Sequence, residues 1–246
     1  MKVNAWFSKL AAKFALCFTD NGYWKWLVEG FKNSLIITFF ALLIGFSVGV
    51  ILAMIRSSYD KNEESLRLRG GFGFWFFKIL NAICKVYITV IRGVPVVVQL
   101  MIWYFVILVS QDNGVIVAIF AFGFNSSAYV AEIFRGGIMS IDQGQFEAGR
   151  SLGFGYVRTM KNIIIPQTVK TVLPTLLNEA IALLKETSVA GYVGIVDLTK
   201  AGDQIRGRTF EAFIPLLVVA AIYLVTVIVF TAIFSAIERR LRKSER

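Results

Sequence analysis

Long uncharged stretches constrain what this chain can fold into more than any other feature of its sequence. Four stretches contain no charged side chain: 33–55, 93–111, 113–131 and 212–237. A helix needs about 20 apolar residues to cross the hydrocarbon core of a bilayer. A fifth apolar stretch, 162–184, contains only Lys170 and Glu179 as charged residues. The sequence therefore predicts an all-α, polytopic membrane protein with five transmembrane helices.

The composition agrees with a membrane protein and excludes several other classes. Hydrophobic residues make up 57% of the chain and charged residues 17%, with a net charge of +10. A soluble domain carries about 25% charged residues, and a basic nucleic-acid-binding domain places its Lys and Arg on one solvated face. Here Lys and Arg lie between the apolar stretches. Disorder, a coiled coil, an ordinary soluble enzyme and a nucleic-acid partner are therefore excluded.

Histidine and cysteine usage excludes further chemistry. The chain has no histidine, which rules out a histidine-dependent acid–base mechanism. Its two cysteines, Cys17 and Cys84, are expected to be small buried side chains. Neither a disulfide nor a zinc site is predicted. The sequence therefore assigns no catalytic, cofactor-binding or metal-binding residue.

Lys and Arg are concentrated in particular connections between the apolar stretches. Three segments share this enrichment: 56–78, 135–161 and the C-terminal tail 239–246. The turn 110–114 has no Lys or Arg. Positive loops stay on the cytoplasmic side of a membrane, so we expect the C-terminus inside and, with five spans, the N-terminus outside. Two basic segments oppose this orientation, the N-terminal residues 2–32 and the connection 200–208.

The same pattern divides the chain into three parts. Residues 1–26 form a basic, partly apolar N-terminal segment, in which Val3–Phe18 is expected to be an amphipathic helix at the membrane interface. Residues 27–238 form the five-helix transmembrane domain, which includes a long inner loop at about 139–161. Residues 239–246 form a basic cytoplasmic tail.

Small residues and prolines mark local features of the predicted spans. Gly45 and Gly49 lie on one helix face and let another helix approach closely, and packing within this chain is favoured over a dimer contact. Pro95 and Pro174 are each expected to kink or break a helix, which frees backbone carbonyls near membrane depth. No internal repeat is found, and an odd number of spans argues against inverted-repeat secondary transporters.

The inner loop between the third and fourth spans is the most informative segment of the sequence. Asp142–Val157 is typical of a short amphipathic helix followed by a turn marked by glycine. Glu147 is expected to favour the N-terminal end of this helix through its dipole, and Gly153 is expected to end the helix. Phe146, Leu152 and Phe154 would supply apolar contacts. The segment is therefore predicted to be a docking surface, with a solvated connector as the alternative.

The same segment resembles the EAA loop of permease subunits of bacterial ABC importers. The resemblance rests on Glu147-Ala148, Gly153, Ile163 and Pro166 at matching spacing. Two positions depart from the family pattern: Gly149 stands where Ala is usual, and Ile165 stands where Leu is usual.

Three further motifs resemble signatures of the polar amino acid uptake branch of this family. Arg92-Gly-Val-Pro95 with Gln99 is similar to one of them, with Val94 in place of Thr. The segments 131–138, Ala-Glu-Ile-Phe-Arg-Gly-Gly-Ile, and 184–188, Leu-Lys-Glu-Thr-Ser, are similar to the other two. With the inner loop, the resemblance covers most of the chain.

The resemblance implies a multi-pass permease subunit in the bacterial cytoplasmic membrane, which translocates a polar amino acid by alternating access. It implies several partners: a cytoplasmic ATPase dimer, a second identical or homologous permease subunit, an extracytoplasmic solute-binding protein, membrane lipid and the amino acid. The chain lacks the phosphate-binding motif GxxxxGK[ST]. The chain is therefore expected to be no enzyme and to bind no cofactor, with ATP and Mg²⁺ held by the partner ATPase.

Individual residues receive roles by this interpretation. ATPase coupling is assigned to Glu147, Ala148, Gly149, Arg150, Gly153 and Phe154. The substrate pathway is assigned to Glu179, Asn178 and Gln99, since a charge inside a span is costly and usually functional. The alternative for Glu179 is an ion pair. Structural or gating roles are assigned to Arg92, Pro95, Glu132, Arg135, Pro166 and Pro174.

Two further alternatives stay open at the level of the sequence. Thr187–Arg208 is interpreted as an outer gate and docking surface for the binding protein, or else as a surface loop without a role. The whole chain could instead be a self-sufficient secondary transporter or channel for a small solute. It could also be an importer subunit for a non-standard substrate such as an opine or cystine.

Overall fold

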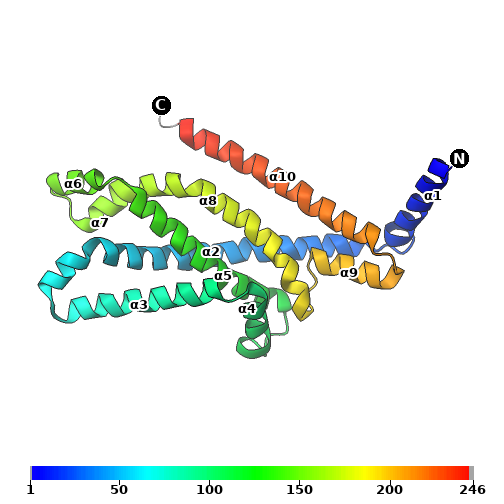
Figure 1. The fold of residues 1–246 in the computed structure, drawn as a ribbon, viewed down its shortest axis with the longest axis horizontal. Helices are drawn as coiled ribbons and strands as arrows, with labels where there is room; N and C mark the ends of the chain where they lie inside the picture. Colours follow the sequence, from blue (N-terminus) through cyan, green and yellow to red (C-terminus); the bar gives the residue numbers. More distant parts are fainter. Residues whose placement is uncertain (1, 244–246) are drawn as a thin grey trace. The chain divides into compact units, whose positions relative to one another are not determined.

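The computed structural model describes residues 2–243, and this part of the chain consists of helices and their connections, with no strand. Figure 1 shows the elements in order. They are α1 (Lys2–Phe14), η1 (Ala15–Thr19), α2 (Trp24–Arg69), α3 (Gly71–Gly93), α4 (Val96–Ile102), η2 (Trp103–Ile107), α5 (Gly114–Ser140), α6 (Gln143–Ser151), α7 (Tyr156–Thr159), η3 (Met160–Ile164), α8 (Ile165–Glu186), η4 (Thr187–Val193), α9 (Leu198–Thr209) and α10 (Phe213–Lys243). Of the predicted basic tail 239–246, the last three residues lie outside the described residues.

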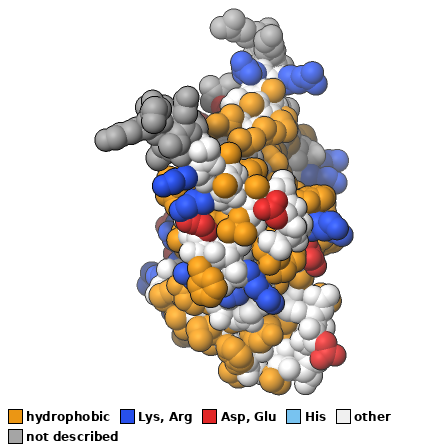
Figure 2. All heavy atoms as spheres, turned by 90° about the vertical axis from the view of Figure 1, so that its right-hand side faces the viewer, with side chains coloured by type: hydrophobic (Ala, Val, Ile, Leu, Met, Phe, Trp, Pro, Cys, Tyr) orange, Lys and Arg blue, Asp and Glu red, His pale blue; other side chains and the backbone are white. Residues whose placement is uncertain are grey.

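Four helices are long and apolar enough to cross a membrane. Their spans are Trp24–Glu64, Gly71–Gly93, Gly114–Ser140 and Phe213–Arg240. Large hydrophobic side chains are exposed on these helices, such as Phe39 on α2, Val86 on α3 and Leu224 on α10. Figure 2 shows broad hydrophobic areas on one face of the molecule, interrupted by charged side chains. Such areas are typical of a surface that contacts lipid or another protein.

The predicted span 93–111 is divided at Pro95 and does not form one continuous helix. Val94 is extended, with φ −102° and ψ 132°, because Pro95 disfavours the helical conformation in the residue before it. The short helix α4 and the π-helical turn η2 follow and end at Ile107. The apolar helix α3 lies before this break, in a region that the sequence analysis placed in a connection. Pro95 therefore breaks the helix, as predicted.

Pro174 was expected to kink or break its helix, and no break is present there. Pro174 lies inside α8, which continues from Ile165 to Glu186. The π-helical turn η3, Met160–Ile164, ends two residues before Pro166. Proline clashes with the carbonyl four residues earlier, and a π turn widens the helix at such a position. The inner loop and α8 are therefore joined by continuous helical backbone.

Close contacts divide the described chain into two compact units. Unit 1 comprises the residues up to Phe40 with Val96–Phe122 and Ile181–Ile233. Unit 2 comprises Ala41–Pro95, Gly123–Ala180 and the residues from Phe234 onward.

Small residues determine how α2 and α5 pack inside unit 2. A Cβ atom added to Gly45 would lie 3.0 Å from Ser126 Cβ, and one added to Gly49 would lie 2.7 Å from Val130 Cβ. A Cβ atom added to Gly123 of α5 would lie 2.8 Å from Ile44 Cβ. Larger side chains at these positions would force the helices apart. The predicted packing of Gly45 and Gly49 within the chain is confirmed.

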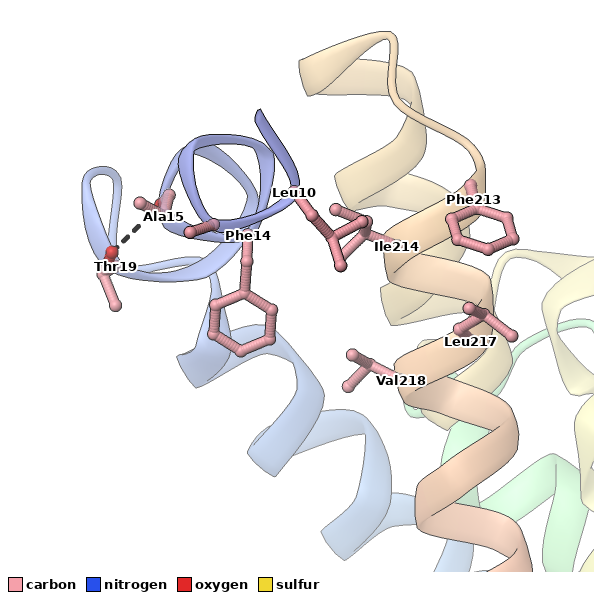
Figure 3. A pocket seen from close by; sticks show the side chains of 9 residues that line it. Leu10, Phe14, Ala15, Thr19, Phe213, Ile214, Leu217 and Val218 are labelled. Atoms are coloured by element: carbon pink, nitrogen blue, oxygen red, sulfur yellow. Dashed lines mark hydrogen bonds between the residues drawn. The ribbon is translucent and has the colours of Figure 1, made fainter. Parts of the chain in front are cut away.

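Unit 1 contains the N-terminal segment, in which α1 and η1 together cover the predicted helix Val3–Phe18, whose place at a membrane interface stays a prediction. Figure 3 shows Leu10 and Phe14 on one side of an apolar groove of about 660 Å³, with Ile214 and Leu217 of α10 on the other. Cys17 and Phe18 are buried in a cluster that includes Leu198, Ala201 and Ile205 of α9. Both cysteines are free and buried, as expected. The N-terminal segment therefore packs against helices of its own chain.

Candidate functional site

The helix α6 has well-defined ends, and each end is set by one residue. The side chain of Asp142 accepts a hydrogen bond from the Gly144 backbone N–H at 2.6 Å and so caps the N-terminal end. At the other end Gly153 adopts φ +76°. The Gly153 N–H then donates to the Arg150 carbonyl at 2.9 Å, and the Phe154 N–H donates to the Gly149 carbonyl at 3.0 Å. This pair of bonds forms a Schellman motif, and the prediction that Gly153 ends the helix is confirmed.

Glu147 does not have the structural position that the sequence analysis expected. The helix α6 begins at Gln143 and has no acidic residue in its first turn. Glu147 lies beyond that turn and is exposed. The favourable interaction of a carboxylate with the N-terminal end of the helix is made by Asp142 instead. Glu147 is therefore available on the surface of α6.

The surface of the inner loop carries apolar side chains, but not all the expected ones. Phe146 is only 3% exposed and packs with Ile138, Met160 and Ile164, because α6 folds back over the ends of α5 and η3. Its prediction as an external contact is wrong. Leu152 is 71% exposed and Val157 is 77% exposed. These side chains make the turn between α6 and α7 an apolar projection.

Charged side chains surround this projection. Glu147 and Arg150 are exposed on α6, as is Ala148. The guanidinium of Arg158 lies 5.3 Å from the centroid of the half-buried Phe154 ring. An exposed apolar centre with a charged rim is typical of a protein contact surface. We refer to Gln143–Thr159 as the coupling segment from here on.

Gly149 allows α6 and α7 to approach closely. A Cβ atom at this position would lie 2.7 Å from both Thr159 Cγ2 and Thr159 Oγ1. The residue that the EAA loop family usually has here, alanine, would therefore not fit against Thr159 without a shift. The departure at Gly149 is thus explained by its neighbour on α7.

Helix α2 supports the coupling segment through several polar contacts in unit 2. Lys61 donates to Gln143 Oε1 at 3.0 Å and lies 4.5 Å from the centroid of the Phe146 ring. The Tyr156 hydroxyl donates to Ser58 Oγ at 3.3 Å. These partners could not be predicted, since no pattern in the sequence links Ser58 or Lys61 to the coupling segment.

An ion-pair network joins the same part of α2 to α5. Arg56 pairs with Glu132, and Arg135 pairs with Glu132 at 3.1 Å and with Asp60 at 3.5 Å. Arg56 and Asp60 are four residues apart on α2, and Glu132 and Arg135 are three apart on α5, so the members of each pair lie about one helical turn apart. This pattern of opposite charges, one turn apart on each helix, is the feature of the sequence from which the contact between α2 and α5 could have been predicted. We refer to these four residues as the α2–α5 network.

The predicted substrate-pathway residues lie in different parts of the molecule. Glu179 is partly buried on α8 and accepts a hydrogen bond from Ser126 Oγ of α5 at 3.1 Å. Asn178, beside it, is exposed. Gln99 is only 6% exposed on α4 and belongs to unit 1. Ser126, which is fully buried, was not predicted from the sequence.

Arg92 and Pro95 lie at the boundary between α3 and α4. The guanidinium of Arg92 lies 5.5 Å from the centroid of the Tyr129 ring of α5, within the range of a cation–π contact. The side chains of Arg92 and Pro95 are both exposed. The end of α3 is therefore held to α5 by an aromatic contact.

The connection 187–208 is an ordered part of unit 1. Asp197 is fully buried and caps α9, accepting hydrogen bonds from the backbone N–H groups of Thr199 at 2.8 Å and Lys200 at 3.0 Å. Burial raises the pKa of Asp197, and these two donors oppose the rise. Asn33 of α2 donates to the Val196 carbonyl at 2.9 Å. These contacts fix the start of α9 to the start of α2.

The helices and the capped coupling segment define a polytopic, all-helical membrane protein. Residues 70–243 match the family of binding-protein-dependent transport system inner membrane components, and the chain belongs to this family. The match includes the coupling segment and every motif on which the family resemblance was based. The resemblance drawn from the sequence is therefore confirmed at the level of the family.

Curated relatives match almost the whole chain. The arginine transport system permease protein ArtQ of Bacillus subtilis (strain 168) is 33% identical over 222 residues, which cover 89% of this chain and 94% of the relative. The glutamine transport system permease protein GlnP of Escherichia coli (strain K12) is 34% identical over 220 residues, which cover 88% and 93%.

Solved structures share the fold. A crystal structure of an amino acid ABC transporter with histidines contains a chain 35% identical to this one, with a TM-score of 0.75 over 89% of this chain and 95% of that chain. The MetNI methionine ABC transporter in an inward-facing conformation also gives a TM-score of 0.75, at 18% identity, covering 91% and 99%. At this low identity, the similarity to the MetNI transporter shows a shared fold and nothing more.

Proposed function

We propose that this chain is the permease subunit of an ATP-driven importer of a polar amino acid. The observation that carries the proposal is a match over almost the whole chain to permeases of arginine and glutamine transport systems. The family membership favours this function over a self-sufficient secondary transporter or channel. The same relatives favour a standard polar amino acid over an opine or cystine.

The partners follow from the class of transport system. The importer contains a cytoplasmic ATPase dimer, an extracytoplasmic solute-binding protein and a second permease subunit, identical or homologous to this one. The chain is itself no enzyme and binds no cofactor, since it lacks the phosphate-binding motif. ATP and Mg²⁺ are bound by the ATPase, and the free energy reaches this chain through protein contacts.

The membrane topology has five spans in the cytoplasmic membrane, with the N-terminus outside and the C-terminus inside. Helices α2, α5, α8 and α10 supply four spans, and Gly71–Ile107 supplies the one between α2 and α5. The distribution of Lys and Arg supports this orientation. The coupling segment and the basic tail then lie on the same side, where the ATPase binds.

The coupling segment transmits the movement of the ATPase. Its exposed residues Glu147, Arg150, Leu152 and Val157 lodge in the ATPase subunit. Phe146 buries the other face of α6 on unit 2, so the segment moves together with the inner ends of α5 and α8. Nucleotide binding then shifts the balance between inward-open and outward-open states by its different affinity for the two.

Glu179 provides the negative charge of the substrate pathway. Its carboxylate would bind the α-ammonium or a cationic side chain of the amino acid, with Ser126 orienting it through their hydrogen bond. Asn178 and Gln99 are further polar groups of this pathway.

Transport in proteoliposomes tests the proposed function. The permease is reconstituted with its ATPase and binding protein, and ATP-dependent uptake is measured for a panel of amino acids, including arginine, lysine, histidine, glutamine and cystine. We expect uptake of one or more polar amino acids that requires both ATP and the binding protein. Uptake that persists without the ATPase would instead identify a self-sufficient transporter.

A further inference from the structure

A second cavity lies in unit 2, and none of its lining residues belongs to the coupling segment. Its volume is about 480 Å³, within the range of small-ligand sites. The lining comes from three helices: Arg56 of α2, Lys85, Ile88, Thr89, Arg92 and Gly93 of α3, and Tyr129 and Glu132 of α5.

Positive charge dominates this cavity. Three cationic side chains, Arg56, Lys85 and Arg92, face the single carboxylate of Glu132. Both oxygens of that carboxylate are already engaged, Oε1 by Arg56 and Oε2 by Arg135. Among residues 2–243, Lys85 and Arg92 form no ion pair within 4 Å, although Arg92 lies within electrostatic reach of Glu132. With three cationic side chains and one carboxylate in its lining, the cavity has an excess of positive charge.

Hydrogen-bond donors in the cavity are also available. Nε of Arg56 is buried and has no hydrogen-bond partner among the described residues. The Arg92 guanidinium lies against the face of the Tyr129 ring, which restrains its position and leaves its N–H groups for a ligand. Guanidinium and ammonium donors around a small cavity are suited to a phosphate group, which accepts several charge-assisted hydrogen bonds at once.

Exposed apolar side chains of α3 alternate along the helix with the residues that line the cavity. Val86 is 62% exposed and Val90 is 53% exposed. Val86 and Val90 lie between Lys85 and Arg92 in the sequence. They are one helical turn apart from each other, so they form an apolar strip along α3. A phosphate group bound in the cavity could thus carry an acyl chain that lies along this strip.

We propose that this cavity binds the phosphate of an acidic phospholipid headgroup from the inner leaflet of the membrane. Basic pockets between transmembrane helices on the cytoplasmic side bind such headgroups. Glu132 and Arg135 lie in the last three turns of α5, next to the coupling segment. The assignment to the inner leaflet rests on the proposed orientation, whereas binding of the lipid does not depend on it.

Native mass spectrometry of the permease purified with its ATPase partner tests the proposal. The complex is titrated with phosphatidylglycerol, phosphatidylcholine and soluble glycerol phosphate. We expect phosphatidylglycerol to bind to the wild-type complex and to bind about 25-fold more weakly to Lys85→Gln/Arg92→Gln, from about fivefold for each charge removed. Phosphatidylcholine and glycerol phosphate are expected to bind at least tenfold more weakly than phosphatidylglycerol.

Two control variants separate the cavity from general charge effects. Arg67→Gln/Lys78→Gln removes two exposed charges from α2 and α3 outside the cavity and should bind phosphatidylglycerol like the wild type. Lys85→Arg/Arg92→Lys retains the cavity charge and should also bind, which excludes misfolding as the cause of a loss. Equal binding by the wild type and Lys85→Gln/Arg92→Gln would overturn the proposal. Tight binding of glycerol phosphate would overturn the lipid assignment and identify a soluble phosphate ligand.

Discussion

At the scale of single residues, two neighbouring glycines have different roles. Gly153 adopts φ +76° in the Schellman motif that ends α6. Gly155 has φ −68° and open space around its Cα. A left-handed conformation costs a residue with a Cβ atom about 1–2 kcal/mol, whereas the conformation of Gly155 is open to any residue.

We predict that Gly153→Ala reduces the coupling of ATP hydrolysis to uptake, because the turn between α6 and α7 must shift to relieve the strain. The measurement is the ratio of amino acid transported to ATP hydrolysed in proteoliposomes. Gly155→Ala is the matched control and should keep the wild-type ratio. Unchanged coupling in Gly153→Ala would remove this turn from the docking surface.

Glu179 gives a second prediction at this scale. We expect Glu179→Gln to reduce uptake of a cationic amino acid at least tenfold, from the loss of a charge-assisted hydrogen bond, and to affect a neutral amino acid less. Glu211→Gln, which removes the carboxylate paired with Lys13 in unit 1, is the control. Uptake of every substrate at the wild-type rate would show that Glu179 is outside the pathway.

Residues whose roles depend on their sequence neighbours were predicted correctly. Residues whose roles depend on which side chains are buried together were not. Gly153 was assigned correctly because a helix end depends on the few residues around it. Phe146 was misplaced because the sequence of a short amphipathic helix does not reveal which of its apolar side chains meets Ile138 and Met160. Ser126, the partner of Glu179, carries no signal in the sequence at all.

At the scale of elements, the packing of α6 on α7 depends on one small residue. We predict that Gly149→Ala lowers the melting temperature of the permease–ATPase complex, because its Cβ would overlap Thr159, and overpacking typically costs about 1–3 kcal/mol. A second change, Thr159→Ala, removes the two clashing atoms and should restore most of the stability. Failure of the double variant to recover would show that another contact limits the space at Gly149.

The α2–α5 network gives a further prediction for elements. Glu132→Gln would leave Arg56, whose side chain is only 13% exposed, without its carboxylate. We expect a loss of about 2 kcal/mol, which is below the value for a fully buried pair because Glu132 remains 23% exposed. Chemical denaturation of the wild type and the variant measures this loss in the free energy of unfolding. Asp60→Asn is the control and should cost less than 1 kcal/mol, since its contact with Arg135 is long and partly solvated. Equal losses in both variants would contradict this ranking.

At the scale of the whole molecule, the sequence predicts the class of fold but misses the helix α3. Four of the five predicted spans coincide with the helices α2, α5, α8 and α10, except for one to three residues at the start of the last three. The fifth, 93–111, is divided at Pro95, where a kink or break was predicted. Counting uncharged residues also passes over α3, because Lys78, Lys85 and Arg92 lie along it. Charge counting is thus reliable only where cationic side chains do not lie along an apolar helix.

Cysteine labelling tests the orientation of the whole chain. In a background of Cys17→Ala and Cys84→Ala, single cysteines are introduced as Leu152→Cys and Tyr192→Cys, at side chains that are 71% and 76% exposed. We expect a membrane-impermeant maleimide to label Tyr192→Cys on intact cells and Leu152→Cys only after permeabilisation. The reverse pattern would invert the proposed topology.

The contacts of Ser58 and Lys61 with the coupling segment have a consequence for engineering. A chimaera that exchanges only the inner loop with a relative would acquire a foreign docking face while keeping the native support beneath it. Tyr156 and Gln143 would be replaced, but their partners on α2 would not. The transplantable module is therefore discontinuous in sequence, and a working exchange of ATPase specificity must carry residues 56–61 along with the loop.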